Sequence, residues 1–258
     1  MSTPPQKQFN VLLIGDSCID EYYYGSCTRL SPEAPVPILN FSHKVVKPGM
    51  AANVYENLKA FDCNVDFRTN VESITKTRYI DSKTGQHLLR VDCDVVLAPF
   101  SSDIDLTAHD AIIISDYNKG FVNESLIADL RKEFKGPMFV DTKKTCLHLF
   151  DGCFIKINEV EFDRLKTVCS DLIVTLGKNG ARYKDKIYPV PRVEVSDVCG
   201  AGDTFLAALA AEFLNTSDIE KAITFANAAA SKSVQQSGVY ALTKQDIRDI
   251  YESFNNRS

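Results

Sequence analysis

The sequence predicts an α/β fold: a doubly wound, mostly parallel sheet with helices on both faces. Short apolar runs typical of buried strands recur at 11–14, 111–115, 138–140, 154–157 and 172–175. Helical patterns separate or follow them at 51–61, 124–134, 201–214, 219–235 and 245–254, with Asn123 as a candidate N-cap. Strands that alternate with helices are typical of a parallel sheet covered on both sides.

One region departs from this alternation and predicts a small β layer beside the main sheet. Segments 22–29, 36–41, 78–80 and 87–91 alternate in the manner of strands without intervening helices. The proline-rich stretch 31–37 suits an edge strand or a turn. We expect a single domain over residues 9–254, with a β lid from about 21–41 and 77–92 and a disordered segment 1–8.

The composition is that of an ordinary globular protein, with 45% apolar residues, 24% charged residues and a net charge of −5. This charge argues against a nucleic-acid partner. A membrane partner is also not expected, because no apolar run is long enough to cross a bilayer and residues 1–8 lack the apolar centre of a signal peptide. Eight scattered cysteines without a Cys-x-x-Cys pair favour reduced thiols and a cytoplasmic location. The four histidines show no metal or catalytic spacing.

Polar and glycine residues follow the ends of the predicted strands. They are Asp16, Asp116, Asp141, Asn158 and Gly177. Each of them alone could be an ordinary turn or cap residue. Because ligands bind outside the carboxyl ends of the strands in open α/β sheets, their joint placement predicts one site assembled from several loops.

The segment Gly200-Ala201-Gly202-Asp203 stands directly before an amphipathic helix. Such a helix N-terminus offers backbone N–H groups and a positive dipole end to an anion, and glycines allow close approach of a ligand. Asp203 could simply cap the helix. Alternatively, it accepts a proton from an attacking hydroxyl while the amides stabilise charge on a transferred phosphoryl group. The segment matches neither the P-loop nor the dinucleotide-binding glycine pattern.

Together with other segments, this turn resembles the ribokinase-like (PfkB) carbohydrate kinases, whose signature is Asp-x-x-Gly-Ala-Gly-Asp, here at 197–203. The chain resembles in particular the D-glycero-β-D-manno-heptose 7-phosphate kinases, the kinase half of the ADP-heptose synthases. The shared stretches lie in the family's order at 15–20, 31–37, 48–54, 75–78, 89–92, 115–120, 158–161 and 225–230. The resemblance implies a ribokinase-like fold and an ATP-dependent transfer of the γ-phosphoryl group.

The resemblance also implies roles on the phosphoryl-transfer side. Asp203 would be the base that deprotonates the sugar's anomeric hydroxyl. The anion hole would be formed by Gly200, Ala201 and Gly202. Asn158 and Glu161 match the family's Asn-x-x-Glu, which helps to place Mg²⁺ and the ATP phosphates, with Glu161 acting on the metal indirectly. The residues around the nucleotide would be Thr175, Gly177 and Asn227.

On the acceptor side, Asp20 and Asn53 would hold sugar hydroxyls, with Gly49 beside them. Three basic residues are candidates for the sugar's own phosphate, because guanidinium and ammonium groups bind phosphate: Lys76, Arg78 and Arg90. The alternative for these three is a solvated charged face. Lys143 and Lys144 follow a strand end, where they could reach ATP phosphates or be surface residues.

The sequence departs from the family's pattern in ways that leave the acceptor open. Met50 replaces a usual glycine, and helical stretches of the relatives are missing at 71–75 and 165–171. No His-x-Gly-His motif of the nucleotidyltransferase half occurs. Heptose 7-phosphate is the favoured acceptor. The alternatives are another sugar or sugar phosphate, or a catalytically weakened sugar- or nucleotide-binding protein. The family also implies a homodimer formed through the lid, whose edges would otherwise be unpaired.

Overall fold

Within residues 8–101 and 103–255, a computed structural model places eight strands in one sheet, in the order β12-β11-β10-β9-β8-β7-β1-β4. The strands from β4 to β10 across this order run parallel, and β11 and β12 continue the sheet antiparallel at one edge. The strands are β1 (Asn10–Gly15), β4 (Asn64–Thr69), β7 (Ala111–Asp116), β8 (Met138–Thr142), β9 (Phe154–Asn158), β10 (Leu172–Thr175), β11 (Ala181–Tyr183) and β12 (Lys186–Tyr188). This confirms the predicted mostly parallel α/β fold.

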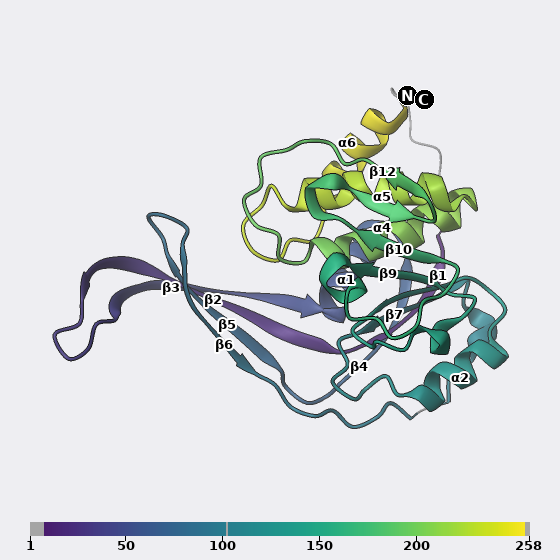
Figure 1. The fold of residues 1–258 in the computed structure, drawn as a ribbon, viewed down its shortest axis with the longest axis horizontal. Coiled ribbons are helices and arrows are strands. Elements are labelled where there is room, and N and C mark those ends of the chain that lie inside the picture. Colours follow the sequence, from purple (N-terminus) through teal and green to yellow (C-terminus); the bar gives the residue numbers. More distant parts are fainter. Residues whose placement is uncertain (1–7, 102, 256–258) are drawn as a thin grey trace.

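Helices cover both faces of this sheet (Figure 1). One face packs against α1 (Ala51–Ala60), α4 (Ala201–Thr216), α5 (Ile219–Ser233) and α6 (Lys244–Asn255). The other packs against α2 (Glu124–Glu133) and the 3₁₀ turn η2 (Leu147–Phe150). Alternate β1 residues divide between the two layers: Val11 and Leu13 face α4, whereas Leu12 and Ile14 face α2. The described chain also contains the one-turn helix α3 (Glu159–Phe162) and the 3₁₀ turns η1 (Leu106–Ala108) and η3 (Gly177–Asn179).

The helix starts follow the sequence signals. Asn123 caps α2 as expected, because its side chain accepts a hydrogen bond from Leu126 N at 2.8 Å. Residues 70–74 and 163–171 connect neighbouring elements without a helix, as the short spacing predicts.

A second sheet, the lid, extends away from this body (Figure 1). Within the described chain it has four strands in the order β3-β2-β5-β6. These are β2 (Ser17–Leu30), β3 (Pro37–Met50), β5 (Thr75–Asp81) and β6 (His87–Cys93). The segment 31–37 makes the turn between β2 and β3, with Ser31 N donating to Val36 O at 2.9 Å. β3 runs farther than the expected 36–41 because it is a largely exposed edge strand, which weakens its apolar alternation and tolerates Pro48.

The lid is joined to the body at its base. β2 follows β1 after only Asp16, and β3 leads without a break into α1. Tyr22 of β2 accepts a hydrogen bond from Val239 N at 3.0 Å, and Lys47 of β3 donates to Ser237 O at 3.1 Å. The lid base therefore lies against the loop that follows α5.

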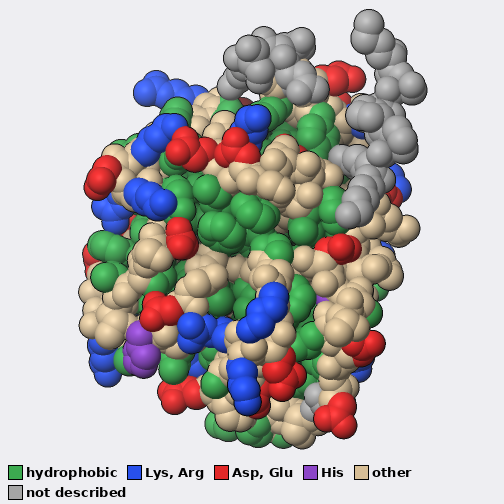
Figure 2. Space-filling view, turned by 90° about the vertical axis from the view of Figure 1, so that its right-hand side faces the viewer, with side chains coloured by type: hydrophobic (Ala, Val, Ile, Leu, Met, Phe, Trp, Pro, Cys, Tyr) green, Lys and Arg blue, Asp and Glu red, His purple; other side chains and the backbone are tan. Residues whose placement is uncertain are grey.

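Two further observations concern the body as a whole. Nowhere between residues 8 and 255, residue 102 apart, is a helix both long and apolar enough to cross a membrane. Figure 2 shows the end of the body opposite the lid, where acidic and basic side chains are interspersed over an apolar surface.

Segment 1–8 was expected to be disordered. Residues 1–7 of this segment lie outside the described residues.

Met50 occupies the junction between β3 and α1 with φ 58° and ψ −131°. This backbone conformation suits glycine, because a Cβ is strained there by about 1–3 kcal/mol. The side chain is only 3% exposed and packs with Cys18 and Ile74 in the core on the α2 side. The family's usual glycine at this position therefore has a physical reason, and this chain carries the strain with a buried methionine.

We predict that Met50→Gly is more stable than Met50→Ala, although both lose the same buried side chain. Alanine keeps the strained conformation, whereas glycine relieves it. Glycine's greater freedom in the unfolded chain offsets about 0.4–1 kcal/mol of that relief. We therefore expect the free energies of unfolding of the two variants to differ by about 1 kcal/mol. Urea unfolding of the two variants measures it. An alanine variant as stable as the glycine variant would show that the junction is unstrained.

Candidate active site

Asp203 lies in the first turn of α4 and is only 4% exposed. Both of its carboxylate oxygens are held by neighbouring elements. Asn53 of α1 donates from Nδ2 to Oδ2 at 3.0 Å, and the Tyr117 hydroxyl, just after β7, donates to Oδ1 at 3.0 Å. The carboxylate is therefore fixed in position.

The environment of Asp203 suits a proton acceptor. Burial raises the pKa of this carboxyl to about 6, and Asp141 adds to the increase. Hydrogen bonds from Asn53 and Tyr117 and the charge of Lys156 oppose it. At neutral pH the group is ionised, and its basicity exceeds that of an ordinary aspartate.

The glycines before Asp203 are required by close packing. Gly200 has φ 78°, and a Cβ there would lie 2.7 Å from Asn53 Nδ2. A Cβ on Gly202 would lie 2.6 Å from Lys156 Nζ. No side chain caps α4 at Gly200, so the N-terminal end of the helix offers its backbone N–H groups to an anion.

A buried ion pair packs beside the turn formed by residues 200–203. Lys156 of β9 and Asp141 of β8 approach to 2.6 Å between Nζ and Oδ2, and both side chains are almost fully buried. Because Lys156 also lies beside Gly202, it adds a positive charge next to the helix N-terminus.

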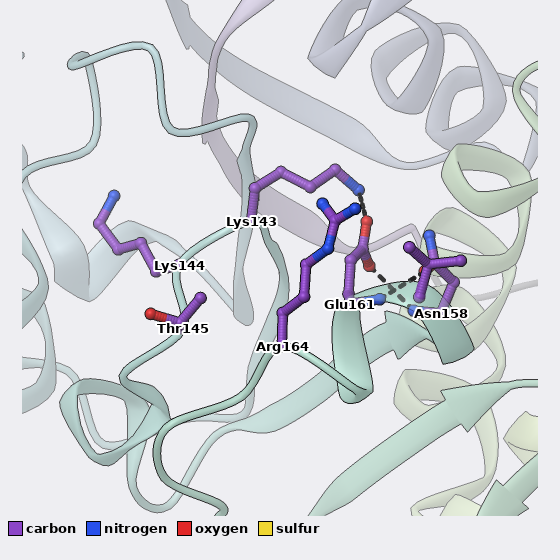
Figure 3. Close-up of a pocket in the computed structure, with 7 residues that line it drawn as sticks. Lys143, Lys144, Thr145, Asn158, Glu161 and Arg164 are labelled. Atoms are coloured by element: carbon purple, nitrogen blue, oxygen red, sulfur yellow. Dashed lines mark hydrogen bonds and ion pairs between the residues drawn. The ribbon is translucent and has the colours of Figure 1, made fainter.

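Asn158 and Glu161 form a capping box at the start of α3. The Asn158 side chain accepts from Glu161 N, and Glu161 Oε2 accepts from Asn158 N, each at 2.9 Å. Glu161 also forms an ion pair with Lys143, and the Arg164 guanidinium lies close by (Figure 3). These residues line a pocket of about 290 Å³ together with Lys144, Thr145 and Val160.

The two lysines after β8 have different environments. Lys144 donates to Asp116 Oδ2 and to Val122 O, each at 2.8 Å, and it points away from Glu161 (Figure 3). Its ammonium group therefore stabilises the loops. Lys143 lies between Glu161 and Asp141, whose carboxylates raise its pKa although burial alone would lower it. Of the pair, Lys143 belongs to the site.

On the acceptor side, Asp20 and Arg78 form a buried ion pair between β2 and β5. The Arg78 guanidinium also lies over the Tyr22 ring, at 5.1 Å from its centroid. Gly49 packs against this pair so closely that a Cβ would lie 1.9 Å from Asp20 Oδ2. Arg78 is thus a buried partner of Asp20, and it does not lie on the solvated charged face that the sequence left open.

The other two basic candidates have separate environments. Lys76 of β5 places its Nζ 5.0 Å from the centre of the Tyr117 ring, next to the hydroxyl that holds Asp203. Arg90 of β6 pairs with Asp92 through two hydrogen bonds of 2.7 Å on the lid surface. Lys76 therefore lies beside the tyrosine that holds Asp203, whereas Arg90 lies on the exposed lid.

Of the residues predicted around the nucleotide, two lie just at and after the end of β10, and the third lies within α5. Thr175 ends β10 and donates to Ile157 O at 3.2 Å, and Gly177 follows with φ 54°. Asn227 of α5 is 3% exposed and donates to Tyr188 O at 2.8 Å, which ties α5 to β12. Their nucleotide-binding roles stay predictions.

The surroundings of Glu161 fit an indirect role toward Mg²⁺. Both of its carboxylate oxygens already accept from protein groups, Lys143 and Asn158 N. Throughout residues 8–101 and 103–255, no group of three or more His, Cys, Asp or Glu side chains is placed to hold a metal ion. Mg²⁺ in nucleotide sites is held mostly by substrate phosphates and water, which agrees with a protein contribution through a single carboxylate.

Comparison with known proteins gives the family. Residues 158–246, from the capping box through Asp203 into α6, match the pfkB family carbohydrate kinase domain. The chain is 28% identical over 304 residues to the bifunctional protein HldE of a Nitratiruptor species, and the match covers 94% of this chain. Its identity to HldE of Vibrio vulnificus (strain YJ016) is 29% over 306 residues, covering 95% of this chain. Residues 158–246 therefore carry a pfkB family carbohydrate kinase domain.

The chain spans 65% and 64% of the lengths of those two relatives. Solved structures agree on the fold. Ribokinase from Thermotoga maritima superposes with a TM-score of 0.67 at 17% identity, covering 95% of this chain and 99% of that one. Phosphofructokinase-2 from Escherichia coli gives 0.71 at 16% identity, covering 96% and 99%. The architecture is therefore ribokinase-like.

Three residues of the candidate site were not given an individual role from the sequence: Tyr117, Asp141 and Lys156. The first two lie at or just after strand ends, which is the signal that marks this site. Lys156 interrupts an otherwise apolar strand, and a lysine buried in a strand requires a partner. What the sequence did not provide was the identity of each partner.

We predict that Gly49→Ala destabilises the protein by about 1–3 kcal/mol, because the new Cβ collides with the Asp20 carboxylate. In an Asp20→Ala background the closest collision is removed and only the contact with Cys18 Sγ, at 2.7 Å, remains, so the same substitution should cost less. A double-mutant cycle measured by urea unfolding tests this coupling. Additive costs would contradict the close packing of Gly49 on Asp20.

Proposed function

We propose that this chain is an ATP-dependent sugar kinase that transfers the γ-phosphoryl group to a sugar hydroxyl, with Asp203 as the base. The observation that carries the proposal is the buried Asp203 carboxylate at the glycine-rich N-terminus of α4, held on both oxygens by Asn53 and Tyr117. A base, an anion-binding helix end and a lid are the parts that phosphoryl transfer requires, because the reaction depends on positioning and charge stabilisation.

In the proposed mechanism, Asp203 takes the proton of the acceptor hydroxyl as its oxygen attacks the γ-phosphorus. The N–H groups of the 200–202 turn stabilise charge on the transferred group, and Lys156 beside Gly202 adds a fixed positive charge. Lys143 lies on the nucleotide side, next to Glu161. The lid excludes water, which limits hydrolysis of ATP.

Mg²⁺, when bound with ATP, would neutralise charge on the β- and γ-phosphates. Glu161 would orient it through water, and Asn158 would hold the start of α3 in place. Thr175, Gly177 and Asn227 would lie around the nucleotide, as the family resemblance implies.

We propose a phosphorylated sugar as the acceptor, with the anomeric hydroxyl of heptose 7-phosphate as the favoured group. Asp20, Asn53 and Gly49 converge at the lid base beside Asp203, which is where sugar hydroxyls would be held. The Lys76 ammonium near Tyr117 suits a negatively charged acceptor. The similarity to HldE proteins supports this choice.

The test is ADP release measured over a set of sugars and sugar phosphates. We expect turnover with heptose 7-phosphate, and a loss of about 10²–10⁴-fold in kcat for Asp203→Asn, which removes the general base. Asp185→Asn, on the exposed turn between β11 and β12, is the matched control and should keep wild-type activity.

Three results would redirect the proposal. Faster turnover of an unphosphorylated sugar would replace the acceptor. An Asp203→Asn variant as active as wild type would remove the base role, and binding without turnover of any acceptor would favour a sugar- or nucleotide-binding protein.

We also propose that two copies pair through the lid. Large apolar side chains are exposed there, including Leu30 at 64% and Phe41 at 62%, and the edge strands β3 and β6 leave backbone groups unpaired within the lid sheet. Light scattering should give about twice the 28.7 kDa of one chain. Phe41→Glu should shift the protein toward the monomer, and a monomeric wild type would contradict the dimer.

A cytoplasmic location also stays a prediction.

A further inference from the structure

Tyr117 lies where three parts of the site meet. It follows β7 directly, and its backbone N–H donates to Asp16 Oδ2 at 2.7 Å. Its hydroxyl donates to Asp203 Oδ1 at 3.0 Å, on the oxygen that Asn53 does not use. Because main chain and hydroxyl are both fixed, the tyrosine links the carboxyl end of the central sheet to the first turn of α4.

The ring of Tyr117 also holds two lysines from different elements. Lys76 Nζ, from lid strand β5, is 5.0 Å from the ring centroid, and Lys143 Nζ, from the loop after β8, is 5.1 Å from it. Such cation–π contacts hold an ammonium group over the ring face, because the ring's electron density attracts the positive charge. One side chain therefore connects the acceptor-side ammonium, the nucleotide-side ammonium and the proposed base.

The electrostatics keep Tyr117 a hydrogen-bond donor. Burial raises its pKa well above 10, and the charges of Asp203 and Asp141 and the Cys18 thiol act in the same direction. The donated hydrogen bond in turn lowers the pKa of Asp203, which burial raises.

Several other groups act on the Asp203 carboxylate from the elements packed around it. Asn53 on α1 and Lys156 on β9 favour ionisation, whereas Asp141 on β8 opposes it. Lys143 and the Cys18 thiol interact with it at longer range. Because Tyr117→Phe keeps the ring and leaves these groups in place, a change in the titration of Asp203 in that variant reports the lost hydroxyl.

We propose that Tyr117 is a positioning residue of this kinase: its hydroxyl holds the base ionised and aimed, and its ring holds Lys76 and Lys143 for the two phosphorylated substrates. This inference rests on the proposed function. During transfer, the acceptor oxygen bonds to the γ-phosphorus, the bond from that phosphorus to the β–γ bridging oxygen breaks, and ADP leaves with the electron pair. Asp203 receives the acceptor's proton, and Tyr117 keeps its own.

Tyr117→Phe removes the hydroxyl and keeps the ring. We expect the acidic limb of the kcat/KM profile to move to higher pH by about one unit, because the base loses a hydrogen bond that favours its ionised form. KM for ATP and for the sugar phosphate should stay within about twofold, since the aromatic face remains for both lysines.

Tyr117→Leu removes the ring as well. The acidic limb should shift as in the phenylalanine variant, and KM for both phosphorylated substrates should rise about fivefold or more, because the two ammonium groups lose their common support. The matched control is Tyr183→Phe, which loses a tyrosine–aspartate hydrogen bond of 2.6 Å to Asp171 at the amino end of β10. This control should leave the pH profile unchanged.

An active wild type whose pH profile matches that of Tyr117→Phe would overturn the hydroxyl's role. Equal KM values for the Phe and Leu variants would overturn the ring's role. A second measurement needs no turnover: the Asp203 carboxyl carbon, followed by ¹³C NMR titration, should titrate at higher pH in Tyr117→Phe than in wild type. An unchanged titration contradicts the inference, whereas an inactive wild type with the expected shift contradicts only the proposed function.

Discussion

The site depends on one constraint: an aspartate carboxylate is buried at the N-terminus of α4. Burial disfavours the ionised form, so neighbouring groups must compensate. Asn53 and Tyr117 do so by hydrogen bonds and Lys156 by its charge. Asn53 comes from α1, Tyr117 from the loop after β7, and Lys156 from β9. Each must approach the Asp203 turn closely. The glycines at 200 and 202 permit that approach, because a Cβ at either position would collide with Asn53 or Lys156.

The same constraint explains how the lid is joined to the body. Asn53 lies on α1, which continues directly from β3, so the strand that forms the lid edge also orients the helix that holds the base. Tyr22 binds the loop after α5 through Val239 N, and Gly238 N of that loop donates to Asp197 Oδ2 at 3.0 Å, just before the glycine turn. Through these contacts, the lid base is connected to both sides of the Asp203 turn.

Met50 shows how a departure from a family pattern acquires a physical meaning. From the sequence, its replacement of a usual glycine left the identity of the acceptor open. The structure directs its side chain into the core with Cys18 and Ile74, and the unusual feature is the backbone, held at φ 58°. The substitution therefore adds strain at the junction of lid and helix, where a glycine would be unstrained.

The sequence by itself determined the alternation of strands and helices, the strand ends that carry the site, and the turn before Asp203. These follow from local periodicity, turn chemistry and motif spacing, which are properties of neighbouring residues. Only the tertiary structure decided which charges meet. It paired Arg78 with Asp20 and Lys144 with Asp116, and it brought Tyr117 to Asp203. Such partners are 58, 28 and 86 positions apart in the chain, and no local pattern encodes them.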